Sequence, residues 1–149
     1  MEDIKAPEAF EIERRLVEEL DIPVMHDDQH GTAIISGAAL INALELANKK
    51  IGEIQMVICG AGAAAISCAK MYKSLGVKKK NILMFDSKGL ININRKDLSL
   101  EKKLFASKNV EIESLTDAIN GSDVFIGLSK ADMTVSYTHL TLPTSSQVL

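Results

Sequence analysis

The chain has 149 residues, of which 46% are hydrophobic and 25% are charged, a length and composition that favour a globular domain with its own core. Its 17 basic and 20 acidic residues give a formal net charge of −3, which excludes the strongly basic surface of a nucleic-acid-binding protein. The N-terminus lacks a secretory-signal pattern, and the most apolar window, residues 32–47, is short for a membrane span. We therefore expect a cytoplasmic protein that has neither a nucleic acid nor a membrane as its partner.

The first predicted element is an amphipathic helix over residues 7–20, because apolar side chains recur there at helical spacing: Phe10, Ile12, Leu16, Val17 and Leu20. A loop with the sequence HDDQHGT is predicted next, over residues 26–32. Thr32 is a suitable N-cap for a second helix, residues 33–48. This helix is apolar almost all round, so we expect it to be buried and closely packed.

From residue 51 onward, short apolar runs alternate with helical segments. The runs predict strands over residues 55–59, 81–85 and 123–127, and the segments predict helices over residues 63–75, 97–108 and 114–119. Strands that alternate with helices pair in parallel through right-handed crossovers. The sequence therefore predicts an α/β fold of the Rossmann-like type, an open parallel sheet with helices on both faces.

The turn after the first strand has the pattern of a dinucleotide-binding motif. Gly60 allows a sharp turn, Gly62 allows the backbone to approach a pyrophosphate, and the small Ala65 allows the helix to lie close to the strand. We include the whole turn, residues 60–65, in the candidate site: Gly60, Ala61, Gly62, Ala63, Ala64 and Ala65.

Asp86 ends the next predicted strand, where an acid that binds a ribose hydroxyl is expected. It favours NAD because its charge repels a 2′-phosphate, but Ser87 and Lys88 leave NADP possible. A tight turn without any ligand is the alternative interpretation of the motif.

The acidic pair Asp27 and Asp28 is the second candidate site. Carboxylates suit the hard ions Mg²⁺ and Mn²⁺, and a second acidic pair, Glu2 and Asp3, precedes the first helix. Surface acids near a helix N-terminus, or acids that bond their own turn, have the same appearance without any metal. The pattern alone leaves these alternatives open.

Five stretches together, in this order and at fitting spacing, resemble the bacterial malic enzymes: EDIKAP (2–7), IPVMHDDQHGTA (22–33), GAGAAAISCAK (60–70), DSKG (86–89) and DVFIGLS (123–129). The resemblance implies oxidative decarboxylation of malate to pyruvate and CO₂ with reduction of NAD⁺ or NADP⁺, using Mg²⁺ or Mn²⁺. It also implies that Glu2, Asp3 and Asp28 bind the metal and that Asp27 contacts the catalytic lysine. Self-association of the full-length enzyme is implied as well.

The same resemblance predicts that the chain is a fragment. The catalytic tyrosine and lysine of the family lie upstream of Glu2, and a further segment lies beyond the C-terminal end, so we expect no turnover from this chain alone. The expected division is residues 1–31 as a helical remnant of the malate and metal domain, residues 32–134 as a truncated dinucleotide-binding domain, and residues 135–149 as a non-native or disordered tail. A stand-alone dinucleotide-binding module and a different oxidoreductase remain alternatives.

Overall fold

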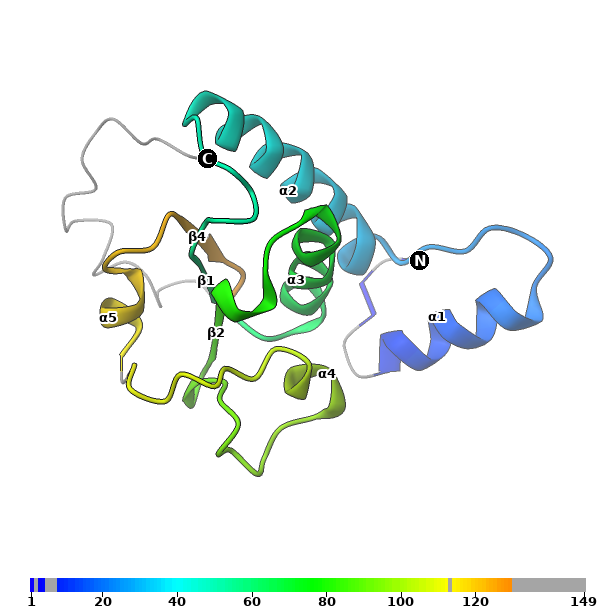
Figure 1. Ribbon diagram of the computed structural model, residues 1–149. Helices are drawn as coiled ribbons and strands as arrows, with labels where there is room; N and C mark the ends of the chain where they lie inside the picture. The colour runs from blue at the N-terminus through cyan, green and yellow to red at the C-terminus, as the bar shows by residue number, and fades with distance from the viewer. Residues whose placement is uncertain (2, 5–7, 113, 130–149) are drawn as a thin grey trace.

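The computed structural model describes residues 1, 3, 4, 8–112 and 114–129, and within this part of the chain four strands form one sheet (Figure 1). Their order is β3-β2-β1-β4, with bounds β1 Met56–Cys59, β2 Ile82–Asp86, β3 Gly89–Leu90 and β4 Val124–Gly127. β1 pairs in parallel with both β2 and β4, while the short β3 pairs antiparallel with β2. The predicted Rossmann-like parallel sheet is confirmed, with an antiparallel edge strand that was not predicted.

β1 and the helix after it follow directly from their residues. All four residues of β1 are buried, as expected of an apolar strand with a neighbour on each side. The helix α3, Ala63–Leu75, ends at Gly76, whose φ of 120° is a conformation that glycine adopts readily. The N–H of Gly76 bonds to the carbonyl group of Lys73. This helix and its end are as predicted.

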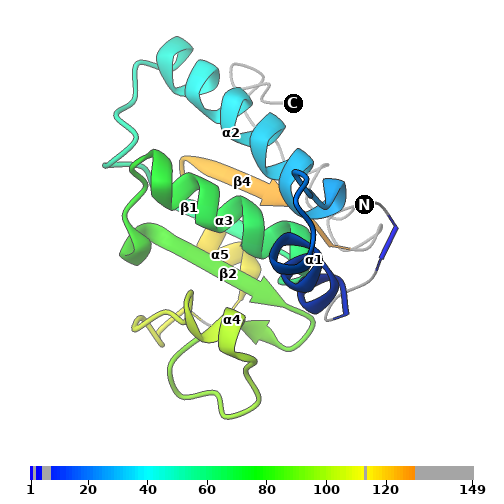
Figure 2. The same ribbon diagram turned by 90° about the vertical axis from the view of Figure 1, so that its right-hand side faces the viewer.

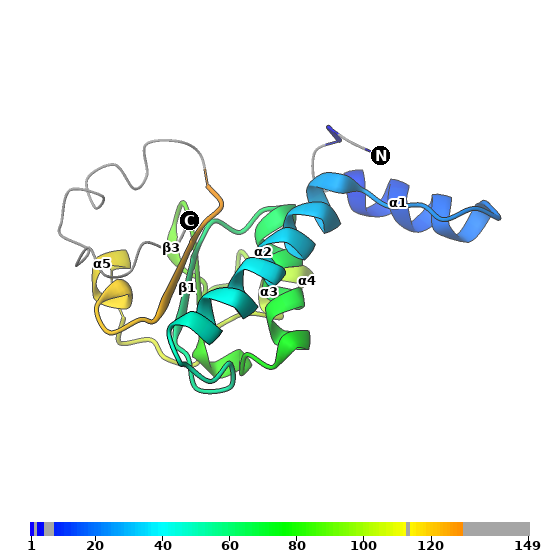
Figure 3. The same cartoon turned by 90° about the horizontal axis from the view of Figure 1, so that it is seen from above.

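Helices lie on both faces of the sheet, which Figures 2 and 3 show from two directions. α2, Asp27–Leu46, packs on α3, and both contribute to the larger hydrophobic core on one face. α5, Leu115–Ile119, contributes Ala118 to a smaller core with Val57 on the other face. The Ser114 side-chain oxygen caps α5 by accepting the N–H of Asp117 at 3.1 Å.

The close packing predicted for the second helix holds on one side of α2 only. A Cβ at Gly37 would come within 3.1 Å of the Met71 side chain of α3, so the small residue allows the two helices to approach closely. On the other side, Ile35 is 72% exposed and Leu46 is 89% exposed. The expectation that α2 is buried all round is therefore wrong for this part of the chain.

The start of α2 also differs from the prediction. The helix begins at Asp27 after His26 as N-cap, and not after Thr32, so most of the HDDQHGT segment is helix and not loop. The expected domain boundary between residues 31 and 32 falls inside this helix, and the division into domains stays a prediction.

The helix α1, Glu8–Glu19, extends to one side of the rest of the molecule (Figure 3). Its helical structure is as predicted, but its apolar stripe is largely uncovered by the described residues: Val17 is 54% exposed and Leu20 just beyond it is 44% exposed. Ala9 and Glu13 are the residues of α1 that are buried.

The segment after β3 contains less helix than its sequence predicts. There α4 covers Leu100–Lys103 only. A short 3-10 helix, η1 at Lys79–Asn81, lies earlier in the chain, directly before β2. The chain leaves the helix because backbone hydrogen bonds fix Ser107 beside another segment: its N–H donates to Ile91 at 2.9 Å, and its carbonyl accepts from Ile93 at 3.0 Å. Leu98 and Phe105 enter the larger core from this region.

No helix in the described residues is long and apolar enough to cross a membrane. The expectation for residues 135–149 lies outside the described residues, as does Glu2.

Candidate functional site

The predicted glycine-rich turn lies between the end of β1 and the start of α3. Gly60 has a φ of 123°, which strains any residue with a side chain, and its N–H donates to the carbonyl of Phe85 in β2 at 2.8 Å. A Cβ on Gly60 would lie 2.6 Å from the carbonyl carbon of Leu128, just beyond β4. Gly60 is therefore required by the backbone of its neighbours.

Gly62 has a different reason to be glycine. Its φ of −83° is open to any residue, and a Cβ there would have no atom within 4 Å in the described structure. The first helical bond of α3 runs from the Ile66 N–H to the Gly62 carbonyl at 3.0 Å, so the N–H groups of residues 63–65 point out of the helix end. Open space above the backbone and outward N–H groups fit a pyrophosphate.

Ala65 occupies the position where the motif needs a small residue. Its side chain is 1% exposed and belongs to the larger core, so the first turn of α3 lies close to the sheet as the motif requires. Ala61, Ala63 and Ala64 are half-buried around the same turn.

Asp86 lies at the end of β2, beside the turn, because its neighbour Phe85 pairs with Cys59. Its carboxylate accepts hydrogen bonds from the Arg95 guanidinium at 2.8 and 3.0 Å, from Lys102 Nζ at 2.8 Å and from the Lys88 N–H at 3.0 Å. Burial raises the pKa of the Asp86 carboxyl, but the bonds from Arg95 and Lys102 outweigh burial and lower it to about 2.

Asp97 extends this network, since it binds Arg95 at 3.0 Å and Lys88 Nζ at 2.7 Å. The five side chains comprise three cations and two anions: Lys88, Arg95, Lys102, Asp86 and Asp97. The negative charge of Asp86 at the rim of the turn is therefore accompanied by cations. Ser87, also predicted as a site residue, is exposed at the same corner.

The acids of HDDQHGT lie in the first turn of α2, at the end of the helix nearest to Met1 and Asp3. The N–H of Asp27 donates to the Met1 carbonyl at 2.8 Å. The Asp27 carboxylate folds over Gly31, where a Cβ would come within 2.9 Å of Asp27 Cγ. Gly31, inside α2, therefore makes room for this carboxylate.

Asp28 lies next to Asp3, since Asp28 Oδ2 accepts the Asp3 N–H at 2.9 Å. Asp3 has a φ of 58°, an uncommon conformation for a residue other than glycine. Within the described residues no group of three or more His, Cys, Asp or Glu side chains could hold a metal ion. The structure thus brings together two of the three predicted metal-binding acids, and the third, Glu2, lies outside the described residues.

A buried histidine faces Asp28. His26 is 0% exposed, and in the described part of the chain neither nitrogen of its ring has a hydrogen-bond partner. Its Nε2 lies 3.9 Å from Asp28 Oδ2. The Asp28 carboxylate, a hard oxygen ligand of the kind that Mg²⁺ and Mn²⁺ prefer, therefore lies beside an unpaired buried ring.

Sequence reasoning missed several residues that touch the predicted sites, among them Arg95, Lys102 and Glu13. Arg95 and Lys102 pair with Asp86, and their signal is weak because surface cations are common. Glu13 contacts the start of α2. The sequence contains a sign of its burial, because this charged residue lies three positions from both Phe10 and Leu16 and thus on the apolar side of the predicted helix.

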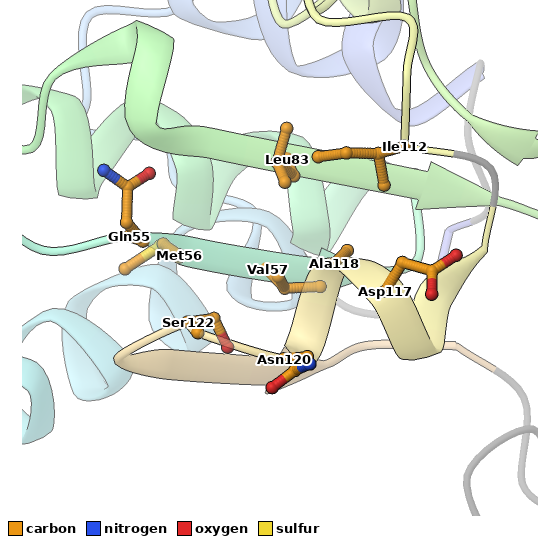
Figure 4. Close-up of a pocket in the computed structure, with 10 residues that line it drawn as sticks. Gln55, Met56, Val57, Leu83, Ile112, Asp117, Ala118, Asn120 and Ser122 are labelled. Carbon is orange, nitrogen blue, oxygen red and sulfur yellow. The ribbon is translucent and has the colours of Figure 1, made fainter.

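A hollow of about 160 Å³ lies on the face of the sheet away from α2 and α3, between α5 and strands β1 and β2 (Figure 4). Val57, Leu83, Ile112 and Ala118 form its apolar part. None of the predicted site residues lines it, so it is separate from both candidate sites.

A mainly parallel sheet with a glycine-rich turn at the carboxyl end of β1, an open helix N-terminus and an acid at the end of β2 defines a dinucleotide-binding domain of the Rossmann-like class. Comparison with family models agrees, because residues 29–140 match the family described as malic enzyme, NAD binding domain. The chain belongs to this family.

Named relatives give the same result. The chain is 52% identical over 129 residues to the NADP-dependent malic enzyme of Halomonas elongata, covering 87% of this chain and 30% of that protein. It is 51% identical over 131 residues to an NAD-dependent malic enzyme of Rhizobium meliloti, covering 88% and 17%. The chain thus spans less than a third of either relative.

Solved structures extend the agreement to three dimensions. The malic enzyme of Entamoeba histolytica superposes with a TM-score of 0.81 at 39% identity, over 86% of this chain and 28% of that one. The NAD-dependent malic enzyme of Thermotoga maritima gives 0.76 at 43% identity, over 87% and 35%. The fold and the family are therefore established together.

Proposed function

We propose that this chain is the nucleotide-binding part of an enzyme that oxidatively decarboxylates malate to pyruvate and CO₂ and reduces NAD⁺ or NADP⁺. The observation that carries the proposal is the open space at Gly62 in front of the α3 N-terminus, in a chain of the malic enzyme family. A bound nicotinamide dinucleotide would accept hydride from C2 of malate, and a divalent metal would polarise the C2 oxygen.

The residues of this chain then have distinct tasks. The N–H groups of residues 63–65 hold the pyrophosphate, while Gly60 keeps the turn in its conformation. Asp86, Ser87 and Lys88 form the rim that meets the adenosine ribose. Such binding fixes the nicotinamide relative to the acidic turn, which is the condition for hydride transfer in a defined geometry.

The acidic turn would supply the metal-binding carboxylates. Asp28 and Asp3 are already adjacent, and Glu2 precedes Asp3 in the chain. Asp27 points over Gly31 and is proposed to orient the lysine base of the complete enzyme. Because that lysine and the tyrosine acid are expected outside this chain, we predict that the chain alone does not turn over malate.

The choice between NAD and NADP depends on the charge of the rim. A lone Asp86 would repel a 2′-phosphate, but Arg95 and Lys102 neutralise it, and the cluster of three cations and two anions carries a formal charge of +1. The rim therefore has no net negative charge to repel a 2′-phosphate, and we propose that both nucleotides are accepted. A cytoplasmic location and self-association of the full-length enzyme also stay predictions.

Calorimetric titration tests the proposal. Wild type and Asp28→Ala are titrated with NAD⁺ and with NADP⁺, each with and without Mn²⁺, and Glu18→Gln on the exposed side of α1 is the control. We expect saturable nucleotide binding that Mn²⁺ strengthens in the wild type and the control but not in Asp28→Ala. Binding that ignores both Mn²⁺ and Asp28 would instead identify a stand-alone dinucleotide-binding module.

A further inference from the structure

Glu13 is a buried carboxylate on a helix that is otherwise largely exposed. Its residue is 8% exposed, and its oxygens accept the His26 N–H at 2.9 Å and the Gln29 Nε2–H at 2.9 Å. His30 Nε2 lies 2.9 Å from Oε1 and 3.1 Å from Oε2. A buried carboxylate needs such hydrogen-bond partners because burial removes the water molecules that would otherwise solvate its charge.

These contacts converge on the first turn of α2. The N-cap residue, His26, makes no side-chain cap bond to the helix, so the turn lacks the local bond that fixes many helix starts. Glu13, 13 to 17 residues earlier in the sequence, holds the residue before the acidic pair and the two residues after it.

Asp27 and Asp28 lie between the residues that Glu13 contacts. With His26 held on one side and Gln29 and His30 on the other, the backbone between them has little freedom. The remaining freedom of Asp28 lies in its side chain, which is fixed in turn by the Asp3 N–H and faces the His26 ring at 3.9 Å.

We propose that Glu13 is a positioning residue for the metal-binding acids, acting through His26, Gln29 and His30 to set the direction of Asp28. The inference rests on the proposed metal role of Asp28 and adds a residue that no motif contains. Outer contacts of this kind orient the ligands of many metal sites, and their loss weakens metal binding about tenfold or more.

The test measures Mn²⁺ binding to the chain by the electron paramagnetic resonance signal of free Mn²⁺, and NAD⁺ binding by metal-free calorimetry. Glu13→Gln keeps the shape of the side chain but replaces one carboxylate oxygen by an NH₂ group, although both oxygens of Glu13 accept hydrogen bonds. Glu18→Gln makes the same change on the same helix at an exposed ion pair with Arg14. Glu13→Gln/Gln29→Glu exchanges the two groups and restores a carboxylate opposite an amide.

We expect Glu13→Gln to weaken Mn²⁺ binding about tenfold, Glu18→Gln to leave it unchanged, and the exchanged double variant to recover most of the loss. Metal-free NAD⁺ binding should be equal in all of them, because the nucleotide turn does not contact Glu13, and this equality also shows that the domain is folded.

The two proposals fail in different ways. Mn²⁺ binding that depends on Asp28 but not on Glu13 would overturn this inference alone, and so would a parallel loss of NAD⁺ binding in Glu13→Gln. No saturable Mn²⁺ binding, or binding indifferent to Asp28→Ala, would overturn the proposed metal site and the inference with it.

Discussion

The two glycines of the nucleotide turn should respond in opposite ways to the same change, alanine substitution. At Gly62 the added methyl group meets no described atom within 4 Å, and the backbone conformation suits alanine. At Gly60 the methyl group would lie 2.6 Å from the Leu128 carbonyl carbon, at a φ of 123°. Gly62→Ala therefore disturbs the space for a ligand, and Gly60→Ala disturbs the fold.

The magnitudes follow from these geometries. Replacing a glycine by alanine in a compatible conformation stabilises by about 0.4–1 kcal/mol, because the unfolded chain loses freedom. The strained conformation at Gly60 costs about 1–3 kcal/mol, and moving the β4 end away adds about 1–3 kcal/mol of overpacking. With about 2–4 °C per kcal/mol for a chain of this size, Gly60→Ala should lower the Tm by roughly 4–24 °C.

Thermal denaturation followed by circular dichroism measures the first effect, and NAD⁺ titration below the Tm measures the second. Gly62→Ala should keep or slightly raise the Tm and weaken NAD⁺ binding at least about tenfold, the scale of about 1.4 kcal/mol. Undiminished NAD⁺ affinity in Gly62→Ala would refute the assignment of this space to the pyrophosphate. A Tm of Gly60→Ala equal to the wild type would refute the steric argument.

Three further predictions concern the rim of the site and the core. The pKa of Asp86 in the folded chain is about 2, below its ordinary value of 3.8, so the ionised side chain adds stability above pH 4 that is lost as the pH falls toward 2. The Tm difference between wild type and Asp86→Asn should therefore shrink between pH 4 and pH 2. A constant difference would contradict the pairing of Asp86 with Arg95 and Lys102. Lys102→Met removes one of the three cations at the rim, so calorimetry should show a larger loss of affinity for NADP⁺ than for NAD⁺, and equal losses would place the 2′-phosphate elsewhere. Ile58→Ala empties a fully buried position in the central strand and should cost about 2–5 kcal/mol in urea denaturation, whereas a cost below 1 kcal/mol would mean that the core refills the cavity.

The sequence by itself determined the elements whose signals are local. The apolar run of β1 predicts a central buried strand because a strand with neighbours on both sides has no solvent face. Gly60, Gly62 and Ala65 predict the turn, Gly76 predicts the end of α3, and Ser114 predicts the start of α5. Each of these signals acts within a few residues through backbone conformation or a cap bond.

The tertiary structure alone decided what depends on residues far apart in the chain. α2 starts at Asp27 because Glu13 and Met1 bind the backbone at the start of the helix, and no residue inside the predicted loop reveals that. α4 is short because Ser107 pairs with residues 91 and 93. A helical period reports which side chains share a face, but it does not report which distant donor or acceptor that face will meet.

The same limit applies to the charge of the nucleotide rim. Asp86 was placed correctly from the end of its strand, while its partners Arg95 and Lys102 were not identified, since they reach it from a segment that returns after β3. A carboxylate interacts with every charge within a few ångströms, whatever its position in the sequence. The position of the acid could therefore be predicted from the sequence, but its electrostatic surroundings required the folded chain.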